Sequence, residues 1–287
     1  MKLGIRHRTR YRYRRPVTVQ PHRLLAVPRC GAELRLDEFI LDAGPDTAIA
    51  WSDDVFGNRI ATIDFTGDRR EIAIDASMVV ELDAPAWPLF AIAVEAHRYP
   101  FPYDEDDRAD LGALAGPASG EADSVAAFAR GFVAAEPTDT LALLKDLNAG
   151  MLPRVAYRPR EEEGTQSPAE TLALGSGSCR DIAALFIACA RGLGFGARAV
   201  SGYLHDPDQA AGGQGSTHAW AEVFLPGAGW IAFDPTHGRV GDAHLIPVAV
   251  ARENRQIMPL TGRYAGSADD LLGMDVDVTV TAMAGAG

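Results

Sequence analysis

The segment Gly175–Phe195, "GSGSCRDIAALFIACARGLGF", places one cysteine between a run of small residues and a long apolar stretch. Ile182, Leu185, Phe186, Cys189 and Leu193 recur at helical spacing, which predicts a helix buried along one face. Ser178 is a suitable N-cap and Asp181 follows three residues later. This capping pattern predicts that Cys179 occupies the first helical position.

That position has a chemical consequence for Cys179. The unpaired N–H groups and the positive end of the helix dipole stabilise a thiolate, which is the nucleophilic form of cysteine. They can also hold a developing oxyanion. Free cysteines are otherwise commonly small buried hydrophobes, and we interpret Cys189, in the middle of the apolar stripe, and Cys30 in this way. The three cysteines lack the spacing of a disulfide framework or a CxxC motif.

Residues 216–238, "STHAWAEVFLPGAGWIAFDPTHG", supply partners for a cysteine nucleophile. His218 lies near the start of one predicted strand and Asp234 at the end of the next. Cys, His and Asp are the minimal set for thiol acyl transfer, because imidazole takes the thiol proton and a carboxylate orients the ring. A four-residue loop over 226–229 would place Asp234 opposite Ala221 and not His218, so we expect a longer loop or a bulge.

Other histidines compete with His218 for the role of base. His205 and His237 lie near the predicted site in the sequence, and both are also typical of solvated loop residues. His237 could face His218 across the hairpin. A zinc site built from Cys179, His218 and His237 lacks the usual ligand spacing, so no metal is expected.

Three further residues are candidates for the site. Gln166, in "GTQSP", has a side-chain amide that could donate to an oxyanion, or it is a turn residue before the predicted cap Ser167. Trp220 lies two residues after His218 on the same strand face, where it would shield the site from water or pack in the core. Tyr203 is a second candidate for the pocket wall.

The N-terminal region has the two-residue period of strands. Between residues 2 and 14, apolar and aromatic side chains alternate with arginines, and residues 71–82 alternate similarly. The arginine face either is solvated and paired with acids of neighbouring strands, or binds an acidic ligand. We therefore predict an all-β, sandwich-like domain over residues 1–85 and a proline- and acid-rich connecting segment over 86–120.

Helical spacing dominates next, and strands return after the cysteine helix. Apolar residues recur at helical intervals at Val125, Phe128 and Phe132, and strand patterns occupy 196–204, 217–225 and 229–236. Residues 121–265 are therefore expected to form an α+β core in which helices pack on an antiparallel sheet. Residues 266–287 read as a C-terminal strand and tail, and their sequence leaves open which sheet that strand joins.

Composition limits the classes of function. The 287 residues are 47% hydrophobic and 23% charged, which is typical of a soluble globular protein. There is no apolar stretch long enough to span a membrane and no apolar segment after the basic N-terminus, so we expect no membrane association and a cytoplasmic location. The net charge of −12 argues against general nucleic-acid binding, although the first thirty residues carry nine Lys or Arg and no acid.

Two stretches of this sequence resemble a known family. "GSGSCRDIAALFIACARGLGFGARAVSGYL" and "THAWAEVFLPGAGWIAFDPT" resemble the transglutaminase-like superfamily, in particular bacterial members described as cysteine proteases. "YRYRRPVTVQPHRLLAVPR" resembles the N-terminal domain that accompanies those bacterial cores. The resemblance implies a papain-like core, with Cys179 as nucleophile, His218 as general base and acid, and Asp234 as the residue that orients His218.

The resemblance also implies a reaction class. It is cysteine-dependent acyl transfer at peptide or amide bonds of a peptide or protein substrate, through a thioester, with hydrolysis as the leading interpretation. One alternative is protein-glutamine transamidation, in which an amine captures the thioester. The other is a non-catalytic module whose β domain binds a protein. No cofactor is expected, and the sequence contains no calcium-binding loop.

Overall fold

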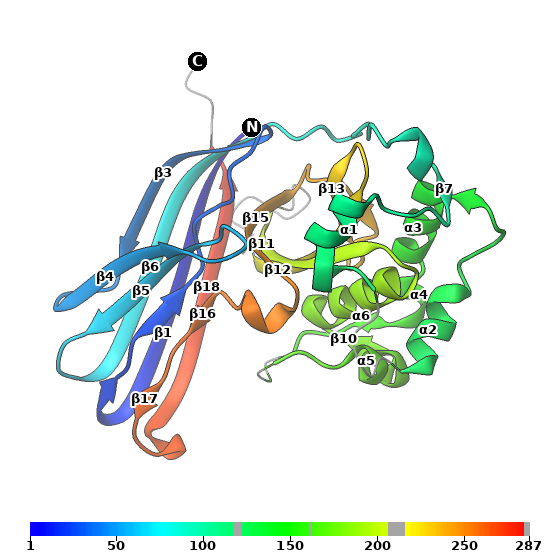
Figure 1. The fold of residues 1–287 in the computed structure, drawn as a ribbon. Helices are drawn as coiled ribbons and strands as arrows, with labels where there is room; N and C mark the ends of the chain where they lie inside the picture. Colours follow the sequence, from blue (N-terminus) through cyan, green and yellow to red (C-terminus); the bar gives the residue numbers. More distant parts are fainter. Residues whose placement is uncertain (117–121, 161, 163, 206–215, 284–287) are drawn as a thin grey trace.

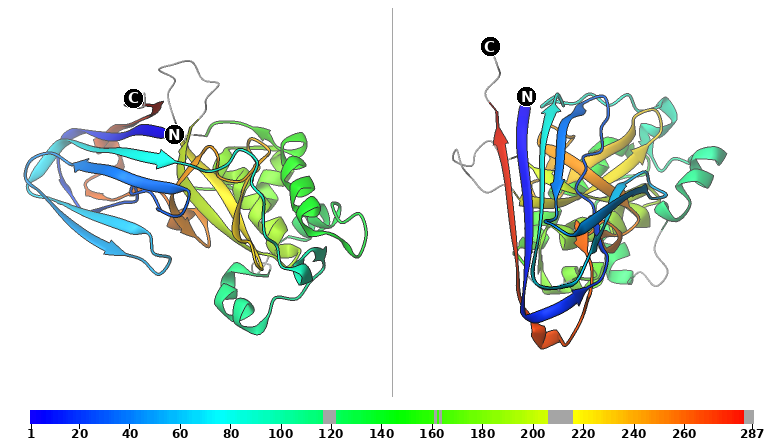
Figure 2. Two further views of the ribbon diagram at one scale, coloured as in Figure 1. Left: turned by 90° about the horizontal axis from the view of Figure 1, so that it is seen from above. Right: turned by 90° about the vertical axis from the view of Figure 1, so that its left-hand side faces the viewer.

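The computed structural model describes residues 1–287 except 117–121, 161, 163, 206–215 and 284–287. Two lobes lie side by side (Figure 1). One is made of strands from both ends of the chain, and the other is made of helices packed on a sheet (Figure 2). The predicted fold class, an α+β core preceded by a β domain, is confirmed.

The β lobe contains two antiparallel sheets. In the first sheet β18 (Leu271–Ala282), β1 (Lys2–Val19), β6 (Asp68–Leu82) and β3 (Leu34–Asp42) lie in this order, with β17 (Tyr264–Ala265) also on β1. The second sheet has the order β16 (Leu260–Thr261), β2 (His22–Leu24), β5 (Arg59–Phe65) and β4 (Thr47–Asp53).

The alternating pattern of β1 sorts its side chains as predicted. Leu3 and Ile5 are buried, and so are the polar residues His7 and Thr9 on the same face. The arginines on the opposite face form ion pairs with acids of the two neighbouring strands: Arg6 with Asp75, Arg10 with Glu71 and Arg12 with Asp275. The basic stripe of the sequence is therefore a set of cross-strand ion pairs.

The C-terminal strand joins the N-terminal sheet. β18 pairs with β1 from Leu3 opposite Ala282 to Tyr13 opposite Leu271. β16 and β17 likewise pair with β2 and β1, so residues 260–265, expected in the core segment, contribute strands to the β lobe. The chain thus leaves the β lobe, forms the core and returns.

The core is a five-stranded antiparallel sheet covered by helices. Its order is β14 (Arg239–Val240), β13 (Gly229–Asp234), β12 (Ser216–Leu225), β11 (Gly196–Leu204) and β15 (Leu245–Ala251). α6 (Cys179–Gly192) packs on β11 and β12, and all five residues of its predicted apolar stripe are buried. The other helices are α2 (Asp123–Arg130), α3 (Thr140–Ala149), α4 (Met151–Arg154) and α5 (Pro168–Leu174), and β9 (Ala156–Tyr157) pairs with β10 (Ser176–Gly177).

The segment between the lobes is more ordered than its proline content suggested. It contains η1 (Val94–Ala96), β7 (Arg98–Tyr99), α1 (Glu105–Leu111) and η2 (Gly112–Leu114), and β7 pairs with β8 (Thr138–Asp139). Asp104 caps α1 by accepting a hydrogen bond from the Asp107 N–H, and Leu111 is buried against the core. The acidic cluster that we predicted to be part of a connecting loop forms the first turn of this helix, where negative charges interact favourably with the helix dipole.

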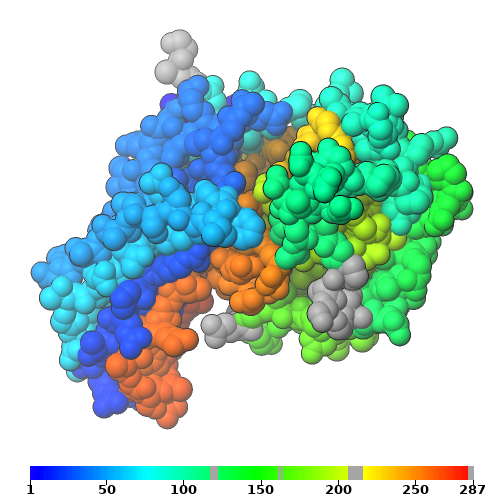
Figure 3. Space-filling model, in the orientation of Figure 1, coloured from blue at the N-terminus to red at the C-terminus, as the bar shows by residue number. Residues whose placement is uncertain are grey.

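Two further short helices, η3 (Asn254–Gln256) and η4 (Ala268–Asp270), lie in the returning segment. Figure 3 shows this returning segment, in orange, between the blue β lobe and the green core. Among the described residues, no helix is long and apolar enough to cross a membrane.

Candidate active site

The loop before α6 is held by a buried carboxylate. Asp181 is fully buried and accepts hydrogen bonds from the N–H and hydroxyl of Ser178, at 2.8 and 2.7 Å, and from the Gln166 N–H at 2.8 Å. Arg160 pairs with the same carboxylate at 2.9 Å. These contacts fix the start of α6, so Cys179 is its first residue, as the sequence predicted.

The β12–β13 hairpin brings His218 and Asp234 to one face of the sheet. Leu225 pairs with Gly229 and Ala221 with Phe233, so the loop is the three residues 226–228. Our expectation of a longer loop or a bulge was wrong. The loop is one residue shorter than the four we considered, and a one-residue change of register moves Asp234 to the other face.

Two glycines permit the short hairpin loop. Gly227 and Gly229 have φ angles of +82° and +74°, which side chains disfavour. A Cβ at Gly227 would also lie 2.6 Å from the carbonyl oxygen of Ala91 in the connecting segment. The tight turn is therefore packed against the segment that joins the lobes.

His218 lies between Asp234 and the thiol of Cys179. Its Nε2 is 3.0 Å from Asp234 Oδ2, and both side chains are at least 95% buried. Because Nε2 contacts Asp234, Nδ1 is the ring nitrogen of His218 that can hydrogen-bond the Cys179 sulfur. The Trp220 indole stacks on the His218 ring with centroids 5.9 Å apart, so Trp220 packs behind the imidazole in the core.

His237 also contacts Asp234. Its Nδ1 is 2.7 Å from Asp234 Oδ2, while Oδ1 of that carboxylate accepts the Thr236 N–H at 3.0 Å. One potential metal-ligand atom from each of His218, Asp234 and His237 lies within 4.8 Å of the other two, so this set could hold a metal ion. The structure therefore places His237 at the site, as a second imidazole on the same carboxylate.

Electrostatics favour a charged Cys179–His218 pair. Burial raises the pKa of the Cys179 thiol, but the hydrogen bond with His218, its charge and the N–H groups of Ala219 and Arg180 more than reverse this effect. The pKa of the thiol is therefore lowered. Burial lowers the pKa of His218, whereas Asp234 and Cys179 raise it to about 9. Asp234 itself has a lowered pKa, because its two imidazole partners outweigh the effect of burial.

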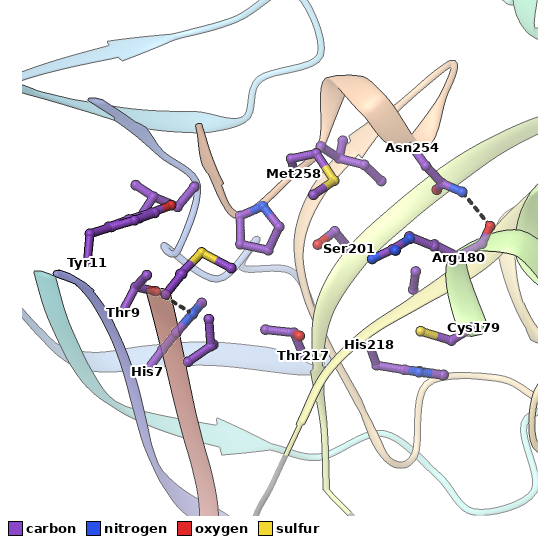
Figure 4. A pocket seen from close by; sticks show the side chains of 16 residues that line it. His7, Thr9, Tyr11, Cys179, Arg180, Ser201, Thr217, His218, Asn254 and Met258 are labelled. Atoms are coloured by element: carbon purple, nitrogen blue, oxygen red, sulfur yellow. Dashed lines mark hydrogen bonds between the residues drawn. The ribbon is translucent and has the colours of Figure 1, made fainter. Parts of the chain in front are cut away.

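A cavity of about 260 Å³ opens between the lobes at the sulfur (Figure 4). The core lines it with Cys179, Arg180, Ser201, Thr217, His218, Ala219 and Asn254. The β lobe and the returning segment line it with His7, Thr9, Tyr11, Ile257, Met258, Pro259, Leu260, Met274 and Val276. Cys179 is partly exposed, so the thiol can meet a molecule in this cavity.

The structure does not bring the other predicted residues into this cavity. Gln166 lines a different cavity, and its Oε1 accepts a hydrogen bond from Thr171 at 3.1 Å. Tyr203 is 2% exposed, and its hydroxyl lies 3.1 Å from Nδ1 of His7. Tyr203 therefore supports a residue of the cavity wall without lining the cavity itself.

The sequence analysis missed the contribution of the β lobe to the cavity. His7, Thr9 and Tyr11 share the inward face of β1, and the alternation that predicted this strand also showed them on one side. A histidine and a threonine on an apolar face were the available signal. The contribution of Asn254 and residues 257–260 had no such signal, because it depends on how the chain returns to the β lobe.

Comparisons with known proteins agree with this geometry. A sequence model of the Transglutaminase-like superfamily matches residues 126–235, which include the cysteine, histidine and aspartate. A second model, the Bacterial transglutaminase-like N-terminal region, matches residues 3–81. The chain has a transglutaminase-like core. The recognition made from the sequence motifs is thereby confirmed.

Individual relatives show how far the transglutaminase-like likeness extends. An uncharacterized protein of Mycobacterium tuberculosis is 29% identical over 96% of this chain and 91% of its own length. One of Mycobacterium leprae is 38% identical over 38% of each chain. A crystal structure from Cytophaga hutchinsonii, described as "a Putative Cysteine Protease", has a TM-score of 0.75 at 18% identity and covers 99% of this chain and 92% of its own. The similarity to the Cytophaga hutchinsonii structure extends over both lobes of this chain, so the two proteins share the same overall fold.

Proposed function

We propose that this chain catalyses cysteine-dependent acyl transfer at peptide or amide bonds, with water as the acceptor. The observation that carries the proposal is the chain of contacts from Asp234 through His218 to a cysteine that lines a cavity. A thiol with a lowered pKa, paired with an imidazole of raised pKa, is the arrangement that nucleophilic thiol catalysis requires.

In the proposed reaction, the Cys179 thiolate attacks the carbonyl carbon and forms a C–S bond. The C–N bond then breaks, and the His218 imidazolium gives its proton to the leaving amine. Water attacks the thioester while His218 accepts its proton, and the C–S bond breaks to restore the thiolate. Asp234 keeps Nε2 of His218 engaged, so Nδ1 faces the sulfur throughout.

The N–H groups of Arg180 and Ala219 hydrogen-bond the Cys179 sulfur, which makes them our candidate donors to a developing oxyanion. The side chain of Gln166 lies outside the cavity, so we do not assign it that role. Backbone donors from the start of α6 and from β12 would then share the charge of the tetrahedral intermediate.

The proposal is tested with a peptide mixture from a proteome digest, incubated in ¹⁸O-labelled water with an added primary amine. If the reaction is hydrolysis, mass spectrometry should find peptides that carry ¹⁸O at a new carboxyl group. It should also find the acyl adduct on Cys179. Amine-joined peptides would instead indicate transamidation. The Cys30→Ala variant is the matched control and should retain activity, because Cys30 lies outside the cavity. Equal product from the wild type and Cys179→Ala, or no product from the wild type, would refute the proposal.

A further inference from the structure

The cavity at Cys179 is lined by one guanidinium and by no carboxylate that could pair with it. Arg180, the second residue of α6, lines the cavity, and none of the 16 lining residues is acidic. His7, which also lines the cavity, is neutral near pH 7, because burial lowers its pKa to about 4. The cation of Arg180 is therefore the charge that a bound molecule meets beside the Cys179–His218 pair.

Nearby carboxylates are engaged elsewhere. Asp181, the next residue, is paired with Arg160 at 2.9 Å and with the loop before α6. Among the residues that the structure describes, no carboxylate forms an ion pair with Arg180, whose Nη2 donates to the backbone oxygen of Glu162. Figure 4 shows its guanidinium extending from α6 toward Ser201, inside the cavity.

Two buried polar atoms of this wall lack partners among the described residues. Nε of Arg180 is a donor without an acceptor, and Oδ1 of Asn254 is an acceptor without a donor. Asn254 is 7% exposed, and its Nδ2 donates to the Arg180 carbonyl oxygen at 2.6 Å, so the two residues form one unit of the wall. Buried polar groups are normally hydrogen-bonded, so the unpaired Nε of Arg180 points to an acceptor on a bound molecule, and Oδ1 of Asn254 points to a donor beside it.

We propose that Arg180 is a carboxylate-binding subsite and that the substrate carries a carboxylate close to the bond that Cys179 attacks. This inference rests on the proposed function and names a class of substrate for it. The carboxylate is the common anionic group of peptides, and a guanidinium binds it well because two of its N–H groups can donate to the two carboxylate oxygens. Tyr11, Met274 and Val276 of the β lobe line the same cavity with mainly apolar surface, so we expect an apolar group next to the carboxylate.

The first test uses two alkylating reagents in place of a substrate. Iodoacetate carries a carboxylate where iodoacetamide carries a neutral amide, so a carboxylate-binding group beside the sulfur should favour iodoacetate. Both alkylate the Cys179 sulfur, and the ratio of their rate constants is measured by peptide mass mapping. We expect this ratio to fall about three- to tenfold in Arg180→Met, and to be partly restored in Arg180→Lys. The backbone N–H that stabilises the thiolate is kept in both variants.

The matched control is Arg59→Met, which removes the same charge from an ion pair with Asp53 on the β lobe and should leave the ratio unchanged. An unchanged ratio in Arg180→Met would overturn the inference while leaving the proposed function intact. Cys179 reacting no faster than the exposed Cys30 with either reagent would instead count against the proposed function.

The second test distinguishes two sources of the carboxylate, an acidic side chain and a chain terminus. Four versions of one cleaved peptide carry Glu or Gln beside an apolar residue, each with a free or amidated C-terminus. A preference for Glu identifies the side chain, and a preference for the free terminus identifies the C-terminal carboxylate. Either preference should disappear in Arg180→Met, and a wild type that cleaves all four equally would overturn the inference.

Discussion

Replacing Asp234 by Asn is expected to slow alkylation of Cys179 by iodoacetamide at pH 6. The substitution keeps the shape of the side chain but removes the charge beside Nε2 of His218 and Nδ1 of His237. Without that charge the pKa of His218 falls from about 9 and the pKa of the Cys179 thiol rises. A smaller fraction of the thiol is then ionised at pH 6.

The separation of the charges sets the size of this effect. Opposite charges 3.0 Å apart, at an effective dielectric constant of about 20, attract by about 5.5 kcal/mol, which is an upper bound because both groups are also desolvated. Hydrogen bonds to charged groups contribute about 1.5 to 3 kcal/mol to stability. That range corresponds to a roughly ten- to hundredfold lower alkylation rate constant at pH 6.

The assay follows the rate constant at Cys179 by mass spectrometry from pH 4 to 10, with thermal unfolding of each protein as a check on the fold. Asp275→Asn is the matched control, since Asp275 is exposed and its ion pair with Arg12 lies on the outer face of the β lobe. The reasoning is refuted if the profile of Asp234→Asn superimposes on that of the wild type.

Three other perturbations test the supports of the site. Asp181→Ala should lower the free energy of unfolding in urea by about 2 to 4 kcal/mol, because it leaves buried donors unpaired; an unchanged denaturation midpoint would contradict this. Gly202→Ala should destabilise by about 1 to 3 kcal/mol or more, since its Cβ would lie 2.1 Å from the Ile246 carbonyl oxygen, whereas Gly273→Ala, with open space around it, should not. Above pH 9 turnover should fall while alkylation stays fast, because only the reaction with a leaving amine needs the His218 proton; parallel profiles would exclude this role.

Local patterns in the sequence were sufficient to predict both lobes. The alternation in β1 and β6 and the stripe of α6 each correspond to a buried face, because side-chain period follows directly from backbone geometry. The sheet that β18 joins was left open. Its pairing with β1 links residues at opposite ends of the chain, and no short-range pattern encodes such a partner.

The site was predictable where a motif fixed its geometry. The cap at Ser178 and Asp181 placed Cys179 correctly at the start of α6. The contact of His218 with Asp234 depended on a turn one residue shorter than we considered, and a difference of one residue reverses the face of a strand. His7 and Thr9 on the apolar face of β1 were a signal that the sequence analysis did not use, whereas the wall from Asn254 and residues 257–260 had none, because it arises from packing between the two lobes.

The central claim is that Cys179 is held as a thiolate by His218 and the start of α6. The most direct measurement is the pH titration of thiolate absorbance in the wild type minus that in Cys179→Ala. Our account predicts a transition below the pKa of about 8.5 of an ordinary cysteine, and a transition displaced upward in His218→Gln. A difference spectrum that titrates at or above 8.5, unaffected by the loss of His218, would contradict it.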